Sequence, residues 1–386
     1  MHKSNVRLWL FRFILLLIVI AALEAIGYLG MWVNSRSFDY LSNKNYFNIR
    51  AMLLGDKNPE CFPRYLSLPY LGYIPYPGYR RHGVVQHNEG GYRGNIVPLV
   101  KTDKFRILCL GGSTTYGLGV DSPSQTFPER LKDLVNDYIL KDSSLRKKYS
   151  GAEVINAGLE AGNSAEELQQ YIFKYRYYQP DVVVVHSGVN DALLVRDAKP
   201  DFQLDYTHYR RMNFHLEPLP MPARTLMNSY LMSFFTIRCF YHSFADNSGD
   251  EFQHSGMQTF CKWSHINLDK VLKNQQYELY PFYKNSKSLY SEITNDSISL
   301  IVFPNALNVN FVKDSSYKKL CALHASLSQN LCKNFNGMFV PFDFDSIKDN
   351  SCWLDDCHVN AKGENFKSLI LFPFVVNALK HKNHLN

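Results

Sequence analysis

The chain has 386 residues, of which 46% are hydrophobic and 20% are charged. This is an ordinary globular composition, so a largely disordered chain is excluded, and the length is enough for one large domain or two modest ones. The net charge of +7 is mild. Its basic residues occur in short pairs rather than long runs, so no nucleic-acid partner is expected.

An apolar segment near the N-terminus is long enough to cross a membrane. It runs from about Phe13 to Val33, and at about 1.5 Å per helical residue a segment of this length covers a hydrocarbon core of roughly 30 Å. Glu24 interrupts it. One carboxylate at that depth costs on the order of 3 kcal/mol, which the surrounding aliphatic side chains can offset.

Positive charge ahead of this segment predicts its orientation. Lys3, Arg7 and Arg12 precede it, and the positive-inside rule keeps such a tail in the cytoplasm and sends the following chain across the membrane. No small-residue cleavage site ends the apolar region clearly, and "AALEA" is the nearest candidate. We therefore expect a cytoplasmic tail (1–12) and an uncleaved single-pass signal anchor (13–33) in the inner membrane, with the main domain periplasmic. A removed signal peptide and a buried core helix are the alternatives.

Export would permit disulfides among the eight cysteines. Their spacing supports no metal site. Cys352 and Cys357 flank a turn that contains Asp and His, so a disulfide between them is one hypothesis, although so short a loop makes the geometry demanding. Cys109 lies inside a predicted strand and is expected to be a small apolar filler.

Residues 34–100 are rich in Tyr, Pro, Asn and Gly, which predicts an irregular linking and packing segment with turns. From residue 101 onward, short apolar runs alternate with helical stretches. The runs are continuous, as in strands buried on both faces of a sheet, and lie at 105–111, 152–158, 181–188, 297–304 and 338–344. Helices are predicted at 124–141, 164–178, 268–293, 315–335 and 361–380. The alternation predicts an α/β domain (101–386) with a mostly parallel five-stranded sheet and helices on both faces.

Two details of this domain carry further expectations. About 100 residues (196–295) separate the third and fourth runs, far more than a usual connection. This insertion fits an ordinary helical insertion with its own small core, a substrate lid, or a helix lying against the bilayer. Ser164 followed by Glu167 predicts a capping box at the start of one helix.

A serine follows the first predicted strand, in "LGGSTTYG" (110–117). The glycine spacing is that of a phosphate-binding loop, but Leu118 stands where that loop requires lysine. The nucleophile elbow G-x-S-x-G is matched at Gly111 and Ser113 but has Thr115 at its last position. Taken alone, Ser113 fits a helix cap or turn residue. As a nucleophile it would need a base within hydrogen-bond reach.

The end of the chain and two further strand ends offer the missing partners. His358 can act as the base, and Asp355, three residues earlier in "DDCH", can orient it. Asp356 is an adjacent competitor whose side chain is expected to point elsewhere. Gly162 and Asn190 follow the second and third runs and can supply an oxyanion hole. Each of these residues, taken singly, also fits an ordinary loop position.

Taken in order, four blocks resemble the SGNH hydrolase superfamily, also called GDSL-type esterases and lipases: "LGGSTTYG", "VINAGLEAGNS", "VVVVHSGVND" and "DDCHVNAKG". The resemblance runs from about residue 105 to the C-terminus, apart from the insertion. It implies a three-layer α/β/α sandwich of flavodoxin-like type. One departure is Gly112, where the family's first block usually has Asp, and this puts the detailed geometry of the turn in doubt.

The resemblance also implies roles for single residues. Ser113 would be the nucleophile and the first oxyanion donor through its own N–H. Gly162 and Asn190 would be the other donors, His358 the base and Asp355 its orienting partner. No cofactor or metal is implied.

The implied activity is that of a membrane-anchored serine esterase. Its substrate would be an acyl ester, acetyl being the favoured group, of a cell-envelope glycan or lipid. The same chemistry fits an O-acyltransferase that modifies an envelope polysaccharide, and such an enzyme would need a multi-span membrane partner to supply the acyl donor. A catalytically silent scaffold with the same fold is the third reading.

Overall fold

The structure is a computed structural model. It describes residues 2–35, 46–56, 64–68, 70–81, 83–197, 202, 204, 206, 219–240 and 267–384. The chain forms two compact units: Met1–Leu66 with Met212–Gln253, and Ser67–Arg211 with His254–Asn386. This division differs from the expected one, because the middle of the 196–295 insertion belongs to the same unit as the N-terminal helix.

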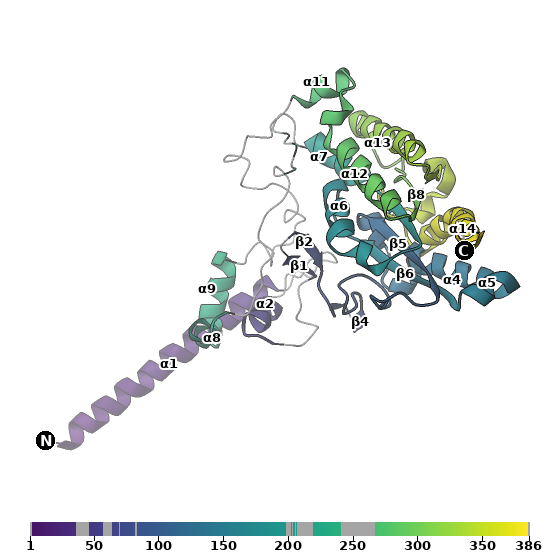
Figure 1. Ribbon diagram of the computed structural model, residues 1–386. Coiled ribbons are helices and arrows are strands. Elements are labelled where there is room, and N and C mark those ends of the chain that lie inside the picture. The colour runs from purple at the N-terminus through teal and green to yellow at the C-terminus, as the bar shows by residue number, and fades with distance from the viewer. Residues whose placement is uncertain are drawn as a thin grey trace. The chain divides into compact units, whose positions relative to one another are not determined.

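The larger unit is built on a five-stranded sheet (Figure 1). Its strand order is β6-β5-β7-β8-β9, and every neighbouring pair is parallel. The strands are β5 (Lys104–Gly111), β6 (Gly151–Gly158), β7 (Val182–His186), β8 (Ser299–Val302) and β9 (Met338–Phe339). All five lie where the sequence predicts strands, so the predicted α/β fold is confirmed.

Helices cover both faces of this sheet (Figure 1). One layer contains α4 (Phe127–Lys141) and α14 (Ala361–His384), and the other contains α6 (Ser164–Phe173), α12 (Pro281–Asn295) and α13 (Ser315–Asn334). Successive side chains of a strand point to opposite faces. Accordingly Ile107 and Cys109 pack with the first layer, and Leu108 and Leu110 with the second. The three-layer sandwich is thus confirmed, and Cys109 is an apolar filler of its core.

Shorter elements connect the layers of the larger unit. The segment 67–100 is less irregular than predicted, since it contains short strands and contributes Tyr92 and Val97 to the core. The shorter elements are β1 (Tyr65–Leu68), where the chain passes from one unit to the other, and β2 (Gly72–Pro75), β3 (Arg80–Arg81), β4 (Val84–Val85), α3 (Ser113–Tyr116), η2 (Pro123–Gln125), α5 (Ser143–Lys148), η3 (Tyr175–Tyr178), α7 (Val189–Asp197), α11 (Leu268–Lys273), η5 (Tyr277–Leu279), η6 (Phe344–Ile347) and η7 (Asn350–Cys352).

The capping box of α6 lies one residue earlier than predicted. Asn163 is the N-cap and accepts hydrogen bonds from the backbone N–H groups of Ala165 and Glu166. Glu166 returns the contact by accepting from the Asn163 N–H at 2.9 Å. The prediction of Ser164 with Glu167 was wrong because Asn and Ser are both good N-caps and Glu stands three residues after each, so the sequence fits the box in two registers.

The described part of the smaller unit is mainly helical. Its helices are α1 (His2–Asn34), α2 (Tyr46–Leu53), α8 (Met221–Met227) and α9 (Tyr230–Phe240). They share a small core of Met31, Tyr46, Ile49, Leu53, Met227 and Ile237. In the described part of the chain, one helix, Val6–Asn34, is long and apolar enough to cross a membrane. The described part of the insertion is thus mainly helical, and its α8 and α9 share this small core.

A buried ion pair joins β5 to β6 and provides a test of the sheet. The Arg106 Nε lies 2.7 Å from the Glu153 Oε1, and the two side chains are 0% and 9% exposed. We expect Glu153→Ala to lower the free energy of unfolding by about 3 kcal/mol, because the Arg106 charge stays buried without its carboxylate. Equilibrium urea unfolding followed by circular dichroism measures the change.

The matched control is Glu278→Ala, which removes an exposed pair with Lys287. It should change the same free energy by less than about 1 kcal/mol. Equal effects of the two substitutions would contradict the importance of the buried pair.

Candidate active site

Ser113 is the first residue of the short helix α3, directly after β5. Gly112 is the N-cap of this helix, and Gly117 ends it in the left-handed conformation. The Ser113 N–H lies at the start of the helix, where intrahelical hydrogen bonds cannot reach it. The turn therefore presents both the hydroxyl and the N–H of Ser113 at the carboxyl edge of the parallel sheet, the edge at which sheets of this kind bind ligands.

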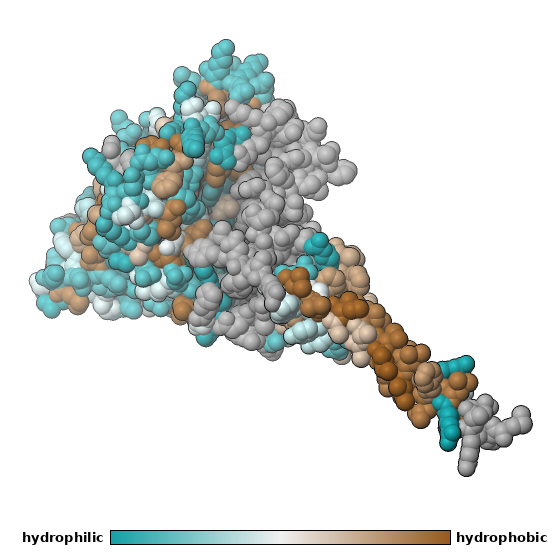
Figure 2. Space-filling view, turned by 180° about the vertical axis from the view of Figure 1, so that it is seen from behind, coloured by the Kyte–Doolittle hydropathy of each residue, from teal (hydrophilic) through white to brown (hydrophobic). Residues whose placement is uncertain are grey.

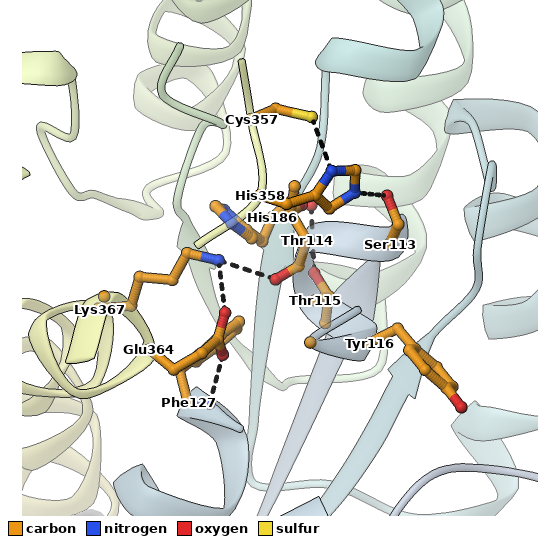
Figure 3. A network of polar contacts seen from close by, with 12 residues as sticks. Ser113, Thr114, Thr115, Tyr116, Phe127, His186, Cys357, His358, Glu364 and Lys367 are labelled. Atoms are coloured by element: carbon orange, nitrogen blue, oxygen red, sulfur yellow. Dashed lines mark hydrogen bonds and ion pairs between the residues drawn. The ribbon is translucent and has the colours of Figure 1, made fainter. Parts of the chain in front are cut away.

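A chain of hydrogen bonds links Ser113 to His358 and Asp355. The Ser113 Oγ lies 2.7 Å from the His358 Nε2, and Figure 3 shows the imidazole edge pointing at the hydroxyl. The opposite ring nitrogen, His358 Nδ1, lies 2.7 Å from the Asp355 Oδ2. The structure thus brings together three residues that the sequence placed 245 and 3 positions apart. No hydrogen bond between His358 and Asp356 occurs in the described part of the chain.

The second carboxylate oxygen of Asp355 is held by its own turn. Asp355 Oδ1 accepts the backbone N–H groups of Cys357 at 2.9 Å and of His358 at 2.7 Å. Partial burial alone would raise the pKa of Asp355, but its hydrogen bond to His358, the imidazole charge and the two N–H groups outweigh burial and lower the pKa to about 2. Asp355 therefore stays ionised above about pH 3 and holds the His358 Nδ1–H toward itself.

Asn190 and Gly162 lie together next to Gly112, the residue before Ser113, but in an unexpected arrangement. The Asn190 Nδ2 donates to the Gly162 carbonyl at 2.6 Å, which leaves its second hydrogen for another acceptor. The Gly162 N–H donates to the Leu159 carbonyl at 2.8 Å and closes a tight turn. The expectation that the Gly162 N–H points into the site is therefore not met in this structure, because the turn after β6 uses that donor.

Gly112 has a direct steric reason to be glycine. A Cβ atom at this position would lie 2.5 Å from the Asn190 Nδ2 and 3.2 Å from the Gly162 carbonyl oxygen. Real Cβ atoms do not approach nitrogen so closely, so a side chain here would displace the Asn190 amide. The usual Asp of the family's first block is thus incompatible with this position of Asn190.

Buried donors hold the α3 turn in place, and the sequence analysis did not identify them. The Arg93 guanidinium donates to the carbonyls of Tyr116 and Gly117 at 3.0 and 2.6 Å. On the other side, the Lys367 ammonium donates to the Thr114 carbonyl at 2.8 Å (Figure 3). No motif marks either residue, because each lies far along the chain from the turn that it holds.

Asp191, the residue after Asn190, is a buried carboxylate. Asp191 accepts the Ser164 hydroxyl at 2.6 Å and the Tyr206 hydroxyl at 2.7 Å through Oδ1, and the Ser164 N–H at 3.1 Å through Oδ2. Burial raises its pKa to about 6, although the bonds from Ser164 and Tyr206 oppose that rise. Glu167 is also buried nearby, and its pKa is raised well above the ordinary value by burial and then by Asp191. This cluster ties the start of α6 to the start of α7.

Cys357 lies beside the imidazole and pairs with no other cysteine. Cys352 and Cys357 are both free thiols, so the hypothetical disulfide is not formed. The Cys357 Sγ lies 3.6 Å from the His358 Nδ1 instead (Figure 3), which directs the thiol toward the ring. Cys61 and Cys261 lie outside the described residues.

Metal binding would conflict with these contacts. The ligand atoms of Asp355, Cys357 and His358 lie within 4.8 Å of one another, the single such cluster in the ranges that the structure describes. However, both ring nitrogens of His358 are engaged in hydrogen bonds. Burial also raises the pKa of the Cys357 thiol well above its ordinary value, whereas a metal needs the thiolate. The three residues therefore fit the hydrogen-bonded chain better than a metal.

The sheet order, the order of the four sequence blocks and the Ser113–His358–Asp355 contacts together decide the type of fold. In its α/β/α layers and in the order of these blocks the larger unit resembles SGNH hydrolases, and we refer to it as the SGNH-type unit. No protein-family model matches the sequence, and no curated protein sequence matches it.

Solved structures with a similar chain course are esterases and acylhydrolases. The lipase/acylhydrolase from Enterococcus faecalis has 15% identity and a TM-score of 0.37, and the match covers 70% of this chain and 94% of that one. An acetylxylan esterase from Geobacillus stearothermophilus has 11% identity and a TM-score of 0.40, over 71% and 93%. The structure of TesA has 13% identity and a TM-score of 0.40, and the match covers 71% of this chain and 99% of that one. Similarity at this level carries no conclusion about the activity of the SGNH-type unit, so its function must be argued from the site.

The raised pKa of Asp191 predicts a pH-dependent stability. The folded-state pKa is about 6 against a reference of 3.8, so the folded protein binds this proton more tightly than the unfolded chain does. The contribution of Asp191 to the free energy of unfolding should fall by roughly 3 kcal/mol as the pH rises from about 4 to 7. Asp191→Asn cannot lose a proton and should lack this fall.

The measurement is urea unfolding of the wild type and of Asp191→Asn at pH 4.5 and pH 7, with the exposed Asp137→Asn as the control. The difference between wild type and Asp191→Asn should change with pH, and the difference for Asp137→Asn should stay nearly constant. A pH-independent difference for Asp191→Asn would contradict the burial of its ionised form.

Proposed function

We propose that the protein is a serine ester hydrolase with Ser113 as nucleophile, His358 as general base and Asp355 as the residue that orients the base. The observation that carries this proposal is the unbroken line of 2.7 Å hydrogen bonds from Ser113 through His358 to Asp355. A serine hydroxyl becomes nucleophilic when a base can take its proton during attack, and the base acts best when a third group fixes its tautomer.

The reaction follows from these contacts. The Ser113 Oγ attacks the ester carbonyl carbon, and its proton moves to the His358 Nε2. Asp355 accepts the Nδ1–H and stabilises the imidazolium that forms. His358 then returns the proton to the alcohol oxygen as the carbon–oxygen bond breaks, which leaves the acyl group on Ser113. Water, activated by the same imidazole, releases the acid.

Negative charge on the attacked carbonyl oxygen needs donors that are already in place. We assign this role to the Ser113 N–H and to the second hydrogen of the Asn190 amide, which lies next to Gly112. The Gly162 N–H would serve as a third only if its bond to the Leu159 carbonyl opened. Gly112 gives the Asn190 amide the room to lie beside Ser113.

The location of the enzyme narrows the substrate class. The apolar helix Val6–Asn34 is long enough to span a bilayer, and Lys3, Arg7 and Arg12 at its N-terminal end favour a cytoplasmic N-terminus. The SGNH-type unit would then lie on the periplasmic side of the inner membrane, to which a signal anchor attaches it. We infer that its substrate is an acyl ester, acetyl above all, of an envelope glycan or lipid within reach of that membrane.

Substitutions at the hydrogen-bonded chain test the mechanism. With p-nitrophenyl acetate as the substrate, Ser113→Ala and Asp355→Asn should each lower kcat by on the order of 10⁴-fold, the first by removing the nucleophile and the second by favouring the wrong tautomer of His358. The neighbouring Asp356→Asn is the matched control and should keep most of the activity. The full-length chain in detergent is the sample.

Each outcome of this experiment is informative. Hydrolysis that survives Ser113→Ala excludes Ser113 as the nucleophile. A wild-type protein without turnover, and without labelling of Ser113 by a fluorophosphonate, supports the silent scaffold. Acyl transfer to an added oligosaccharide in preference to water supports the acyltransferase.

Gly112 and Asn190 give a second test, directed at the oxyanion donors. Asn190→Ala should lower kcat by about 10²-fold or more. Gly112→Ala should cause a comparable loss, because the new Cβ displaces the same amide. The double variant should be no slower than Asn190→Ala alone. Multiplied losses in the double variant would show that Gly112 acts through something other than Asn190.

A further inference from the structure

Glu24, the acidic residue inside the apolar helix α1, caps another helix. Its Oε2 accepts the Tyr230 N–H at 2.6 Å, and its Oε1 accepts the Ser229 hydroxyl. The first N–H groups of a helix have no partner within that helix, and a carboxylate placed there satisfies them and interacts favourably with the helix dipole. The residue that interrupts the predicted membrane span is therefore a docking contact for α9.

Two glycines of α1 allow α9 to approach closely. A Cβ atom on Gly27 would lie 2.2 Å from the backbone nitrogen of Leu231, and a Cβ atom on Gly30 would lie 3.0 Å from the Phe234 ring. Small residues at such spacing let helix backbones meet, as between helices inside membranes. The contacts advance in the same direction along both helices, so α9 runs along α1 toward its C-terminal end.

Arg50 of α2 satisfies the turn between α8 and α9. Its guanidinium donates to the carbonyls of Met227 and Asn228, both at 3.0 Å, and to the Ser233 hydroxyl at 3.1 Å. It also lies over the Tyr230 ring, 4.6 Å from the ring centre. The turn thus has polar partners on both sides, Glu24 for its N–H groups and Arg50 for its carbonyls. A turn that meets lipid needs partners of this kind from its own protein.

The outward face of α8 and α9 is mainly apolar, although Thr225, Asn228 and Arg238 are also exposed. A helix that is apolar on both its docked and its outward faces belongs in a protein core or in a membrane. Met232, Phe235 and Cys239 follow helical spacing along one face of α9. The large apolar side chains exposed on the two helices include Met221, Leu226, Met232, Phe235 and Phe240, with exposed fractions from 41% to 77%.

The residue of α1 at which packing with α9 begins matches the expected position of a membrane boundary. No helix of the described ranges packs on residues 6–23 of α1, and their large apolar side chains are exposed (the brown surface along the helix in Figure 2). At about 1.5 Å per residue these residues span roughly 27 Å, close to the thickness of a hydrocarbon core, and the long side chains of Arg7 and Arg12 can extend from the N-terminal end of this stretch to the headgroups. Packing on α1 begins at Glu24.

We propose that α2, α8 and α9 form a collar around the C-terminal part of α1 that lies in the bilayer interface, with the outward side chains of α8 and α9 in contact with lipid. The occupant of this surface is the leaflet adjoining Glu24, because the apolar surface of the collar continues that of α1. The insertion then supplies a second membrane-binding element, as an interfacial helix does. This inference depends on the proposal that α1 spans a membrane.

A carbene label that dissolves in hydrocarbon tests the collar. The full-length chain is reconstituted into vesicles of phosphatidylethanolamine and phosphatidylglycerol, labelled with 3-(trifluoromethyl)-3-(m-iodophenyl)diazirine and digested for mass spectrometry. We expect label in residues 8–23 of α1 and in the α9 peptide that contains Met232 and Phe235. The exposed Phe173 of α6 should carry none.

Variants separate the collar from the anchor. In the double variant Met232→Ser and Phe235→Ser, the α9 peptide should lose its label while α1 keeps its own. Phe173→Ser, which removes a ring of the same exposure from the SGNH-type unit, should leave both labels unchanged. Label on α1 with none in residues 221–240 of the wild type would overturn the collar and leave the anchor intact. An unlabelled α1 would overturn the proposal that this helix spans the membrane.

Discussion

The position of Ser113 depends on one constraint, which is that the carbonyl groups of a very short helix are buried and must find donors. The helix α3 has four residues, too few to satisfy its own backbone. Arg93 and Lys367 supply the missing donors from opposite sides of the turn. An unsatisfied buried carbonyl costs about 1–3 kcal/mol. The α3 turn that carries Ser113 is therefore stable in this shape only while Arg93 and Lys367 both donate to its carbonyls.

The base is positioned in a different way, by its own turn. Both oxygens of Asp355 are used within four residues, one on the His358 ring and the other on the backbone N–H groups of the same turn. The tertiary fold then has only to bring this preassembled turn to the carboxyl edge of the sheet. Asn190 lies in the first turn of α7, which follows β7, the strand beside β5, and Gly112 leaves the space that its amide occupies.

Pairing of polar groups in apolar surroundings recurs in both units. Arg106 and Glu153 neutralise each other in the sheet, Asp191 takes three donors behind the site, and Glu24 and Arg50 satisfy the two sides of the α8–α9 turn. Each group would be costly if it stood alone. With their partners, these groups define how the elements that carry them align. Hydrophobic packing alone would define that alignment less sharply.

The sequence by itself determined the elements and their order, because continuous apolar runs mark buried strands and because parallel strands bring their following residues to one edge. It also determined the Asp355–His358 contact, which is local. Only the tertiary structure decided the rest. Arg93 and Lys367 act on a turn more than 20 and more than 250 residues away along the chain, the Gly162 N–H is taken by a turn, and α9 packs on Gly27 across some 200 residues. Such contacts depend on which surfaces meet after folding, and no local periodicity or spacing encodes them.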